Sequence, residues 1–227
     1  MTNNNSTASS HKISVSRTPV YKIDSIIFDL DGTLWDSTAV VTGAWNSVLN
    51  RHPEVAFHAT AENLKKLFGR PLFEIADIMM PDLEPKIRYE IIDACCEQEH
   101  IDLRSTPGTL YPCLEQTLAA LSTRYPLFIV SNCEAGYIET FLEVTGLGKY
   151  FKDFECPGSS GLLKGPNNKL IMERNHLSSP VYVGDTQGDK DSAVYAEIPF
   201  CHAAYGFGTV DSCDYSIDTF SDLLKLF

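Results

Sequence analysis

The chain has 227 residues, of which 44% are hydrophobic and 21% are charged. Acidic residues number 30 and basic residues 18, so the formal net charge is −12. This balance argues against a nucleic acid or an anionic membrane as partner, since both attract basic surfaces. No apolar run approaches the roughly 18 residues of a membrane span. The seven cysteines include no Cys-x-x-Cys pair, which favours free thiols and a cytoplasmic location.

Residues 1–20 are rich in Asn, Ser and Thr and are expected to form a flexible tail. Such a composition buries too little apolar surface to offset the entropy of ordering. A Ser-rich start without acidic residues would also suit an organellar transit peptide. However, Ile13, Val15 and Val20 form no clear helical stripe, which favours the disordered extension.

Short apolar segments farther along the chain have the character of buried strands. The first, from Ile23 to Leu30, runs directly into the turn Asp31-Gly32-Thr33. Uninterrupted apolar strands are typical of a parallel sheet that helices cover on both faces. Three later segments share this character: residues 126–130, 181–183 and 198–202.

Helical patterns separate these strands and predict the fold class. They comprise leucines between 110 and 121, residues 137–144, and residues 166–176 with Pro166 at the first helical position. Strands that alternate with helices predict an α/β fold. We therefore expect a Rossmann-like core of three layers around a parallel sheet.

Residues 37–103 break this alternation, because they carry helical signals only. Four helices are expected there, at about 41–49, 64–68, 72–79 and 87–95. We interpret this stretch as an inserted α-helical cap domain. The core then consists of residues 21–36 and 104–227, and Pro107-Gly108 marks the return to it.

Acidic residues follow the first strand, in the segment DLDGTL at positions 29–34. Asp29 and Asp31 are two residues apart and point to the same side of an extended chain. Ligand sites of open α/β sheets lie beyond such strand ends. Two neighbouring carboxylates repel unless a cation lies between them. An ordinary Asp-Gly turn is the alternative for this segment taken alone.

Three further signals are expected at the same edge of the sheet. Ser131-Asn132 ends the second strand, Lys164 precedes a Gly-Pro helix start, and the acidic turn GDTQGD at 184–189 ends the third strand. Each of them alone fits a plain turn, a solvated lysine or a helix cap. Together they predict a site for a hard cation beside an anion receptor, suited to Mg²⁺ and phosphate.

These motifs, in this order, resemble those of the haloacid dehalogenase superfamily: DLDGTL, VSN at 130–132, Lys164 and GDTQGD. The inserted helices resemble the cap of its first subclass, and the whole is similar to its phosphoglycolate phosphatases. The resemblance implies a Mg²⁺-dependent phosphatase that hydrolyses a small phosphate monoester through an aspartyl-phosphate.

The resemblance also implies roles for individual residues. Asp29 would be the nucleophile, and Asp31 would serve as general acid and then as general base. Mg²⁺ would be bound by the Asp29 carboxylate, the Asp31 carbonyl and Asp185, with Asp189 supporting them from behind. The groups implied to bind the phosphoryl oxygens are Thr33, Ser131, Asn132 and Lys164.

Departures from the family's patterns narrow the activity. Dehalogenase and phosphonatase members lack the aspartate at Asp31, so this residue argues against both activities and against a Schiff base at Lys65 or Lys66. Val41 stands where sugar-phosphate mutases carry a histidine. Cys133 replaces a lysine common in phosphoglycolate phosphatases, which leaves the substrate open. A non-catalytic module that binds a phosphorylated ligand and a sugar-phosphate mutase are the alternatives.

The cap is expected to select the substrate. Residues 68–71 join two predicted cap helices, and Arg70 could form a fork there for a carboxylate, a second phosphate or a sugar hydroxyl. Residues 36–38 and 105–108 are expected to be mobile hinges. The only partner expected is the small-molecule phosphate ester, bound by a monomer or a weak homodimer.

Other conspicuous residues receive structural interpretations. Trp45 fits the apolar stripe of the first cap helix, whereas Trp35 could be buried or could line the cleft. His52 and His58 lack metal-ligand spacing and are expected at the surface. Cys133 is expected to be buried and inert.

Overall fold

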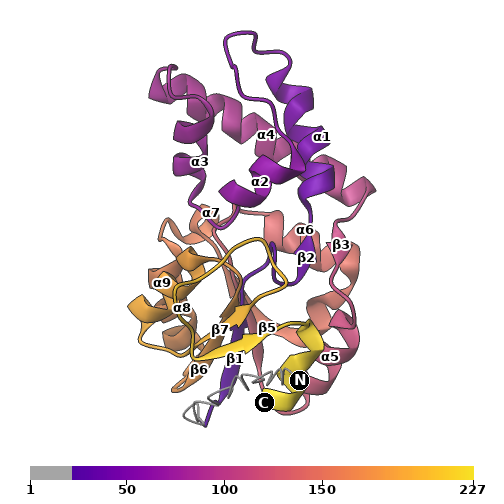
Figure 1. The fold of residues 1–227 in the computed structure, drawn as a ribbon, viewed down its shortest axis with the longest axis vertical. Helices are drawn as coiled ribbons and strands as arrows, with labels where there is room; N and C mark the ends of the chain where they lie inside the picture. Colours follow the sequence, from indigo (N-terminus) through magenta and orange to yellow (C-terminus); the bar gives the residue numbers. More distant parts are fainter. Residues whose placement is uncertain (1–21) are drawn as a thin grey trace, which may run out of the picture.

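A parallel six-stranded sheet lies at the centre of the computed structural model, which describes residues 22–227 (Figure 1). Its strand order is β5-β4-β1-β6-β7-β8. The predicted tail, residues 1–20, lies outside the described residues. The strands are β1 (Ser25–Phe28), β4 (Leu127–Val130), β5 (Phe151–Glu155), β6 (Pro180–Gly184), β7 (Phe200–Ala203) and β8 (Tyr215–Ile217).

Helices cover both faces of this sheet. In β1 the side chains of Ile26 and Phe28 belong to one apolar core and that of Ile27 to another, because successive residues of a strand face opposite sides. The first core is shared with α5 (Leu114–Ser122), α6 (Tyr137–Thr145) and α10 (Leu223–Leu226). The second is shared with α8 (Lys164–Asn175) and α9 (Gln187–Ala196). The predicted three-layer α/β core is confirmed.

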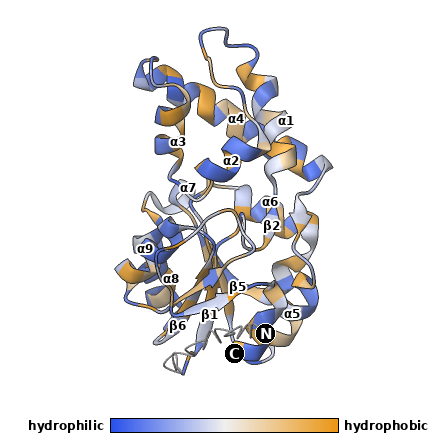
Figure 2. Ribbon diagram, viewed as in Figure 1, coloured by the Kyte–Doolittle hydropathy of each residue, from blue (hydrophilic) through white to orange (hydrophobic). Residues whose placement is uncertain are grey.

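The helices of the cap lie together beyond the carboxyl ends of the strands, at the top of Figure 1. Figure 2 shows that they carry both hydrophobic and hydrophilic residues. The apolar positions expected in the first cap helix are all buried. Ile87, the first residue of the fourth expected helix, is exposed, because the buried positions of that helix begin one turn later, at Ile91. The cap helices are α1 (Thr38–Leu49), α2 (Ala61–Leu67), α3 (Leu72–Met79) and α4 (Pro85–Ser105).

A short antiparallel ribbon joins the cap to the core. Strand β2 (Trp35–Asp36) pairs with β3 (Thr109–Leu110), so the chain enters and leaves the cap side by side. Leu110, expected in a helix, therefore lies in this ribbon, and α5 begins at Leu114. Trp35 is fully buried against the rings of Tyr137 and Phe141, so it belongs to the core and not to the cleft. The domain limits near these positions stay a prediction.

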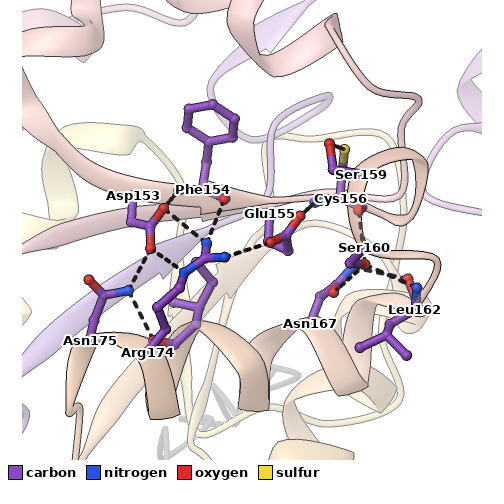
Figure 3. A network of polar contacts seen from close by, with 11 residues as sticks. Asp153, Phe154, Glu155, Cys156, Ser159, Ser160, Leu162, Asn167, Arg174 and Asn175 are labelled. Carbon is purple, nitrogen blue, oxygen red and sulfur yellow. Dashed lines mark hydrogen bonds and ion pairs between the residues drawn. The ribbon is translucent and has the colours of Figure 1, made fainter.

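Edge strand β5 was not expected from the sequence, because charged residues interrupt its apolar pattern. Two of them bind helix α8: Arg174 donates to Asp153 at 2.8 Å and to Glu155 at 2.9 Å (Figure 3). Helix α8 itself begins at Lys164, so Pro166 is its third residue and not its first. The first amides of a helix have no acceptor within it, which makes proline acceptable there as well.

The remaining regular elements are short connections. They are α7 (Pro157–Ser160) and the 3₁₀ turns η1 (Leu147–Tyr150) and η2 (Phe220–Asp222). Edge strand β8 was also not expected, since it has only three residues. Among residues 22–227, no helix combines the length and the apolar character needed to cross a membrane.

Candidate active site

The loop after β1 is packed tightly against the loop after β6. The amide of Asp29 donates to the carbonyl of Val183 at 2.8 Å. Gly32 has a φ of +82°, and a Cβ atom there would collide with the Asp185 carboxylate. Only glycine fits both the backbone angle and the close approach. The Asp-Gly turn therefore brings two distant acidic segments together.

Three buried carboxylates meet at this point. Oxygen atoms of Asp29, Asp185 and Asp189 all lie within 4.8 Å of one another. The ammonium group of Lys164 is 2.7 Å from Asp29 Oδ1 and 2.7 Å from Asp189 Oδ1, and it is almost completely buried. Lys164, at the start of α8, therefore bridges the nucleophile candidate and the motif after β6.

Burial makes it unfavourable for all carboxyl groups of this cluster to be ionised together. It raises the pKa of Asp29 to about 6, and Asp189 adds to the rise although Lys164 opposes it. Burial also raises the pKa of Asp185 well above its ordinary value, with further contributions from Asp189 and Asp29. A single lysine thus leaves excess negative charge in a desolvated place. A hard divalent cation with oxygen ligands would neutralise it, so the donor set fits Mg²⁺.

Asp189 is tied to the start of helix α9. Its Oδ2 accepts hydrogen bonds from the amides of Asp185 and Thr186, at 3.1 and 2.9 Å, and from the Thr186 hydroxyl at 2.7 Å. A carboxylate with these bonds and a lysine contact is firmly oriented. This arrangement agrees with a supporting role behind the metal ligands, which stays a prediction.

Asp31 lies outside the three-carboxylate cluster. Its Oδ1 accepts a hydrogen bond from the Ser37 hydroxyl at 2.5 Å, and the Tyr137 hydroxyl is 2.9 Å from the same oxygen. Tyr137 is also 2.9 Å from Ser37 Oγ. Burial raises the pKa of Asp31 to about 7, despite these hydrogen bonds. A carboxyl group of this kind can exchange a proton near neutral pH.

The residues expected to bind phosphate converge on the same edge, but their side chains have different partners. Ser131 lies at the end of β4 and lines the cavity described below. Thr33 Oγ1 is 3.5 Å from Asp185 Oδ1. Asn132 donates to the carbonyl of Gly69 in the cap at 2.8 Å. Its Oδ1 is buried and has no hydrogen-bond partner among residues 22–227.

A small, partly open cavity of about 50 Å³ lies between the core and the cap. Its volume leaves room for only a few non-hydrogen atoms. The core contributes Asp29, Asp31, Ser131, Asn132 and Tyr137 to its lining. The cap contributes Trp45, Phe68, Arg70, Cys96 and Glu99.

Arg70 reaches this cavity from the segment between α2 and α3, as the sequence predicted for its position. Gly69, with a φ of +85°, allows the turn there. The side chain of Arg70 is about half exposed, and its Nη1 lies 3.7 Å from Glu74 Oε2. The structure thus places Arg70 beside the candidate site with an acidic neighbour, and its role in substrate binding stays a prediction.

Three residues of the site were not found from the sequence: Ser37, Tyr137 and Glu99. The first two reach Asp31 across 6 and 106 positions of the chain and left no pattern. Glu99 did leave a signal. It is four residues after Cys95 and four before Leu103, so it is a charged residue within the buried stripe of α4.

Other conspicuous residues lie as follows. Trp45 is buried in the cap core, as expected, and also lines the cavity. His52 pairs with Glu54 at 3.2 Å, and His58 is exposed. Cys133 lines the cavity, and burial raises the pKa of its thiol well above the usual range, which disfavours the reactive thiolate.

The chain belongs to the haloacid dehalogenase-like hydrolases, whose family model matches residues 26–203. A phosphoglycolate phosphatase of Vibrio parahaemolyticus is 28% identical over 224 residues, which cover 90% of this chain and 96% of that protein. A phosphoglycolate phosphatase of Aquifex aeolicus is 25% identical and covers 88% and 95%, respectively. The expected resemblance and the enzyme class, a phosphatase-type hydrolase, are thereby confirmed.

Solved structures share the fold. A predicted phosphoglycolate phosphatase from Haemophilus somnus has a TM-score of 0.77 at 22% identity, covering 90% of this chain and 97% of that one. A CbbY mutant from Rhodobacter sphaeroides, crystallised with xylulose-1,5-bisphosphate, has a TM-score of 0.75 at 17% identity and covers 88% and 96%. At these identities the likeness concerns the fold alone.

Proposed function

We propose that this protein is a Mg²⁺-dependent phosphatase that hydrolyses a small phosphate monoester through an aspartyl-phosphate at Asp29. The observation that supports this most directly is the buried cluster of Asp29, Asp185 and Asp189 around Lys164. Asp31 and Ser131 lie at the same sheet edge and open onto the same cavity. The curated relatives, named as phosphoglycolate phosphatases, agree with a small phosphate ester as substrate.

In the proposed reaction, the Asp29 carboxylate attacks phosphorus while Asp31 gives its proton to the departing alcohol oxygen. Asp31, now ionised, then takes a proton from a water molecule that attacks phosphorus and releases phosphate from Asp29. The raised pKa of Asp31, about 7, suits a group that must hold a proton first and accept one later. Mg²⁺ bound by Asp29, Asp185 and the Asp31 carbonyl would offset the repulsion between nucleophile and phosphate.

The phosphoryl oxygens are proposed to bind the Ser131 hydroxyl, Lys164 and the backbone amides near Thr33. The side-chain amide group of Asn132, which donates to the Gly69 carbonyl here, would exchange that partner for a phosphoryl oxygen. Arg70 is proposed to contact the substrate from the cap. The fork of a guanidinium suits an anion or a hydroxyl, and no particular one is assigned to it.

The test is release of phosphate from p-nitrophenyl phosphate. Turnover is expected to need Mg²⁺ and to stop after chelation with EDTA. Asp29→Asn should remove it, because no phosphoenzyme can form, and Asp31→Asn should slow it by ~10²-fold or more. Asp82→Asn is a matched control, since Asp82 is an exposed carboxylate of the cap. Ligand binding without turnover would indicate the phospho-ligand module instead.

We also propose a cytoplasmic location, supported by seven cysteines that are all free thiols. The net charge of −12 supports a protein without a nucleic-acid partner. A monomer or weak homodimer stays our expectation for the assembly, and sedimentation at micromolar concentration would test it.

A further inference from the structure

Glu99 is a carboxyl group on the cap side of the candidate site. It comes from the middle of α4, is only 7% exposed, and lines the cavity that also contains Asp29 and Asp31. Its Oε2 accepts a hydrogen bond from the indole nitrogen of Trp45 in α1. This bond fixes the carboxyl group between two packed helices. Glu99 is thus a built feature of the cavity and has no assigned role in the proposed chemistry.

The charges around this cavity are unbalanced. Of the described residues that line it, only Arg70 is basic, and that side chain is half exposed and close to Glu74. Lys164, nearby, is already shared between two carboxylates. Glu134 adds another acidic group to the lining. A further carboxylate placed beside Glu99 would lose its hydration without gaining a free cation, which is costly.

A hydrogen-bond donor in the same place would instead be bound favourably. A hydroxyl or an ammonium group on the departing alcohol could donate to Glu99, and an ammonium group would also compensate the negative charge. The apolar neighbours Trp45 and Phe68 surround this position and strengthen such a bond by excluding water. The cavity therefore discriminates by the charge of the leaving group as well as by its size.

We propose that Glu99 is the specificity-determining residue for the leaving group. It selects phosphate monoesters of small alcohols that carry a hydroxyl or ammonium donor, and it disfavours those that carry a carboxylate, such as 2-phosphoglycolate. This inference rests on the proposed phosphatase activity and goes one step beyond it.

The test is a series of two-carbon phosphate esters of nearly equal size. They are phosphoethanolamine, 2-hydroxyethyl phosphate, ethyl phosphate and 2-phosphoglycolate. Their kcat/KM values are measured with the Mg²⁺-loaded full-length protein at a pH above about 8, where the Glu99 carboxyl group is ionised. The two esters with donors should be hydrolysed best and 2-phosphoglycolate worst, with ~10-fold or more between the extremes. The two donor esters together show whether charge or hydrogen bonding dominates.

Glu99→Gln removes the charge and keeps an acceptor for Trp45. The ratio of kcat/KM for phosphoethanolamine to that for 2-phosphoglycolate should fall ~10-fold or more, whereas a packing defect would lower both values in proportion. Glu97→Gln, an exposed carboxylate on the same helix, is the matched control and should leave the ratio unchanged.

The outcomes separate the two proposals. If p-nitrophenyl phosphate and all four esters are inert, the phosphatase proposal fails and takes this inference with it. If p-nitrophenyl phosphate is hydrolysed but 2-phosphoglycolate is the best of the four esters, Glu99 does not exclude carboxylates and this inference alone is wrong. Loss of the preference for 2-phosphoglycolate in Arg70→Ala would then show that Arg70 binds the carboxylate of the substrate. An unchanged ratio in Glu99→Gln would equally overturn the inference.

Discussion

The hydroxyl groups around Asp31 fix the carboxyl group that must transfer a proton. Ser37 belongs to the entrance of the cap and Tyr137 to the first turn of α6, so two parts of the chain hold one oxygen atom. Only one of the two oxygens of Asp31 is held in this way by these hydroxyls. Such orientation matters most when the alcohol is a poor leaving group, because its oxygen must then receive a proton early in the reaction.

Tyr137→Phe is therefore expected to slow alkyl phosphates by about 10-fold and p-nitrophenyl phosphate much less, since nitrophenolate leaves without a proton. Steady-state kcat on both classes of ester measures this difference. Tyr150→Phe is a suitable control, because its hydroxyl binds Glu115 at the surface of the core. Equal losses on both classes would mean that Tyr137 serves the fold and does not orient Asp31.

Glu99 links the specificity of the site to the stability of the protein. Burial raises its pKa to about 8, although the hydrogen bond from Trp45 lowers it. In the unfolded chain its pKa is near 4.5. Between these values the folded protein holds a proton that the unfolded chain releases. The contribution of Glu99 therefore becomes less favourable as pH rises from about 4.5 to about 8.

Glu99→Gln removes this dependence, because glutamine does not ionise. The variant should exceed the parent protein in free energy of unfolding by about 1 kcal/mol or more at pH 8. The advantage should disappear towards pH 5. Urea unfolding at several pH values, with Glu97→Gln alongside, measures it. A difference that stays constant with pH would show that Glu99 is not buried as a neutral acid.

At the scale of elements, the β2–β3 ribbon is the only paired connection between cap and core in the described part of the chain. Gly108 lies beside it, and a Cβ atom there would come within 2.8 Å of the Trp35 ring and 3.1 Å of the Asp36 carbonyl. Gly43, in the exposed part of α1, has no such neighbour within 4 Å. The two glycines thus form a matched pair.

Gly108→Ala should destabilise the protein by about 1–3 kcal/mol, because backbone and a buried ring must move apart. Gly43→Ala should stabilise it by about 0.5–1 kcal/mol, since alanine loses less entropy in a helix. Thermal unfolding of both variants measures the contrast. Similar effects of both substitutions would show that the ribbon is not a tightly packed connection between cap and core.

The elements that the sequence predicted well are those whose apolar pattern is complete. The strands β1, β4, β6 and β7 are buried, and their mainly apolar runs revealed them. The edge strands β5 and β8 escaped, because an edge is partly solvated and tolerates charged residues such as Asp153. The four cap helices could be predicted from a different pattern. Each buries only one face, so its apolar residues recur at helical spacing.

The residues of the site were likewise predictable only where a local pattern of the sequence marks them. Motif residues such as Asp29 and Asp185 could be predicted because they follow buried strands directly, and the sheet fixes where those strands end. The contact between Asn132 and Gly69 depends on how the cap sits on the core, and the contact between Tyr137 and Asp31 depends on how helix α6 packs against the loop after β1. No local pattern encodes that placement, so these partners required the structure.

At the scale of the whole molecule, the sheet order explains why charge concentrates at one point. Strand β1 lies between β4 and β6, although these strands are about 100 and 150 residues away in the chain. Their carboxyl ends deliver the acidic and hydroxyl groups of three motifs to one place. Folding thus forces three carboxylates together against one lysine, and the metal-free protein bears that repulsion.

Mg²⁺ should therefore stabilise the folded protein by mass action, since the unfolded chain does not assemble the cluster. At a Mg²⁺ concentration of about 100 times its dissociation constant the gain is about 2.7 kcal/mol, which a rise in Tm would report. Asp185→Asn should remove most of this rise and should make the metal-free protein more stable, because it relieves one buried negative charge. The exposed Asp82→Asn control should keep the full rise. An equal rise in Asp185→Asn would place the metal elsewhere on the protein and would remove the cluster as its site, whatever the activity of the variant.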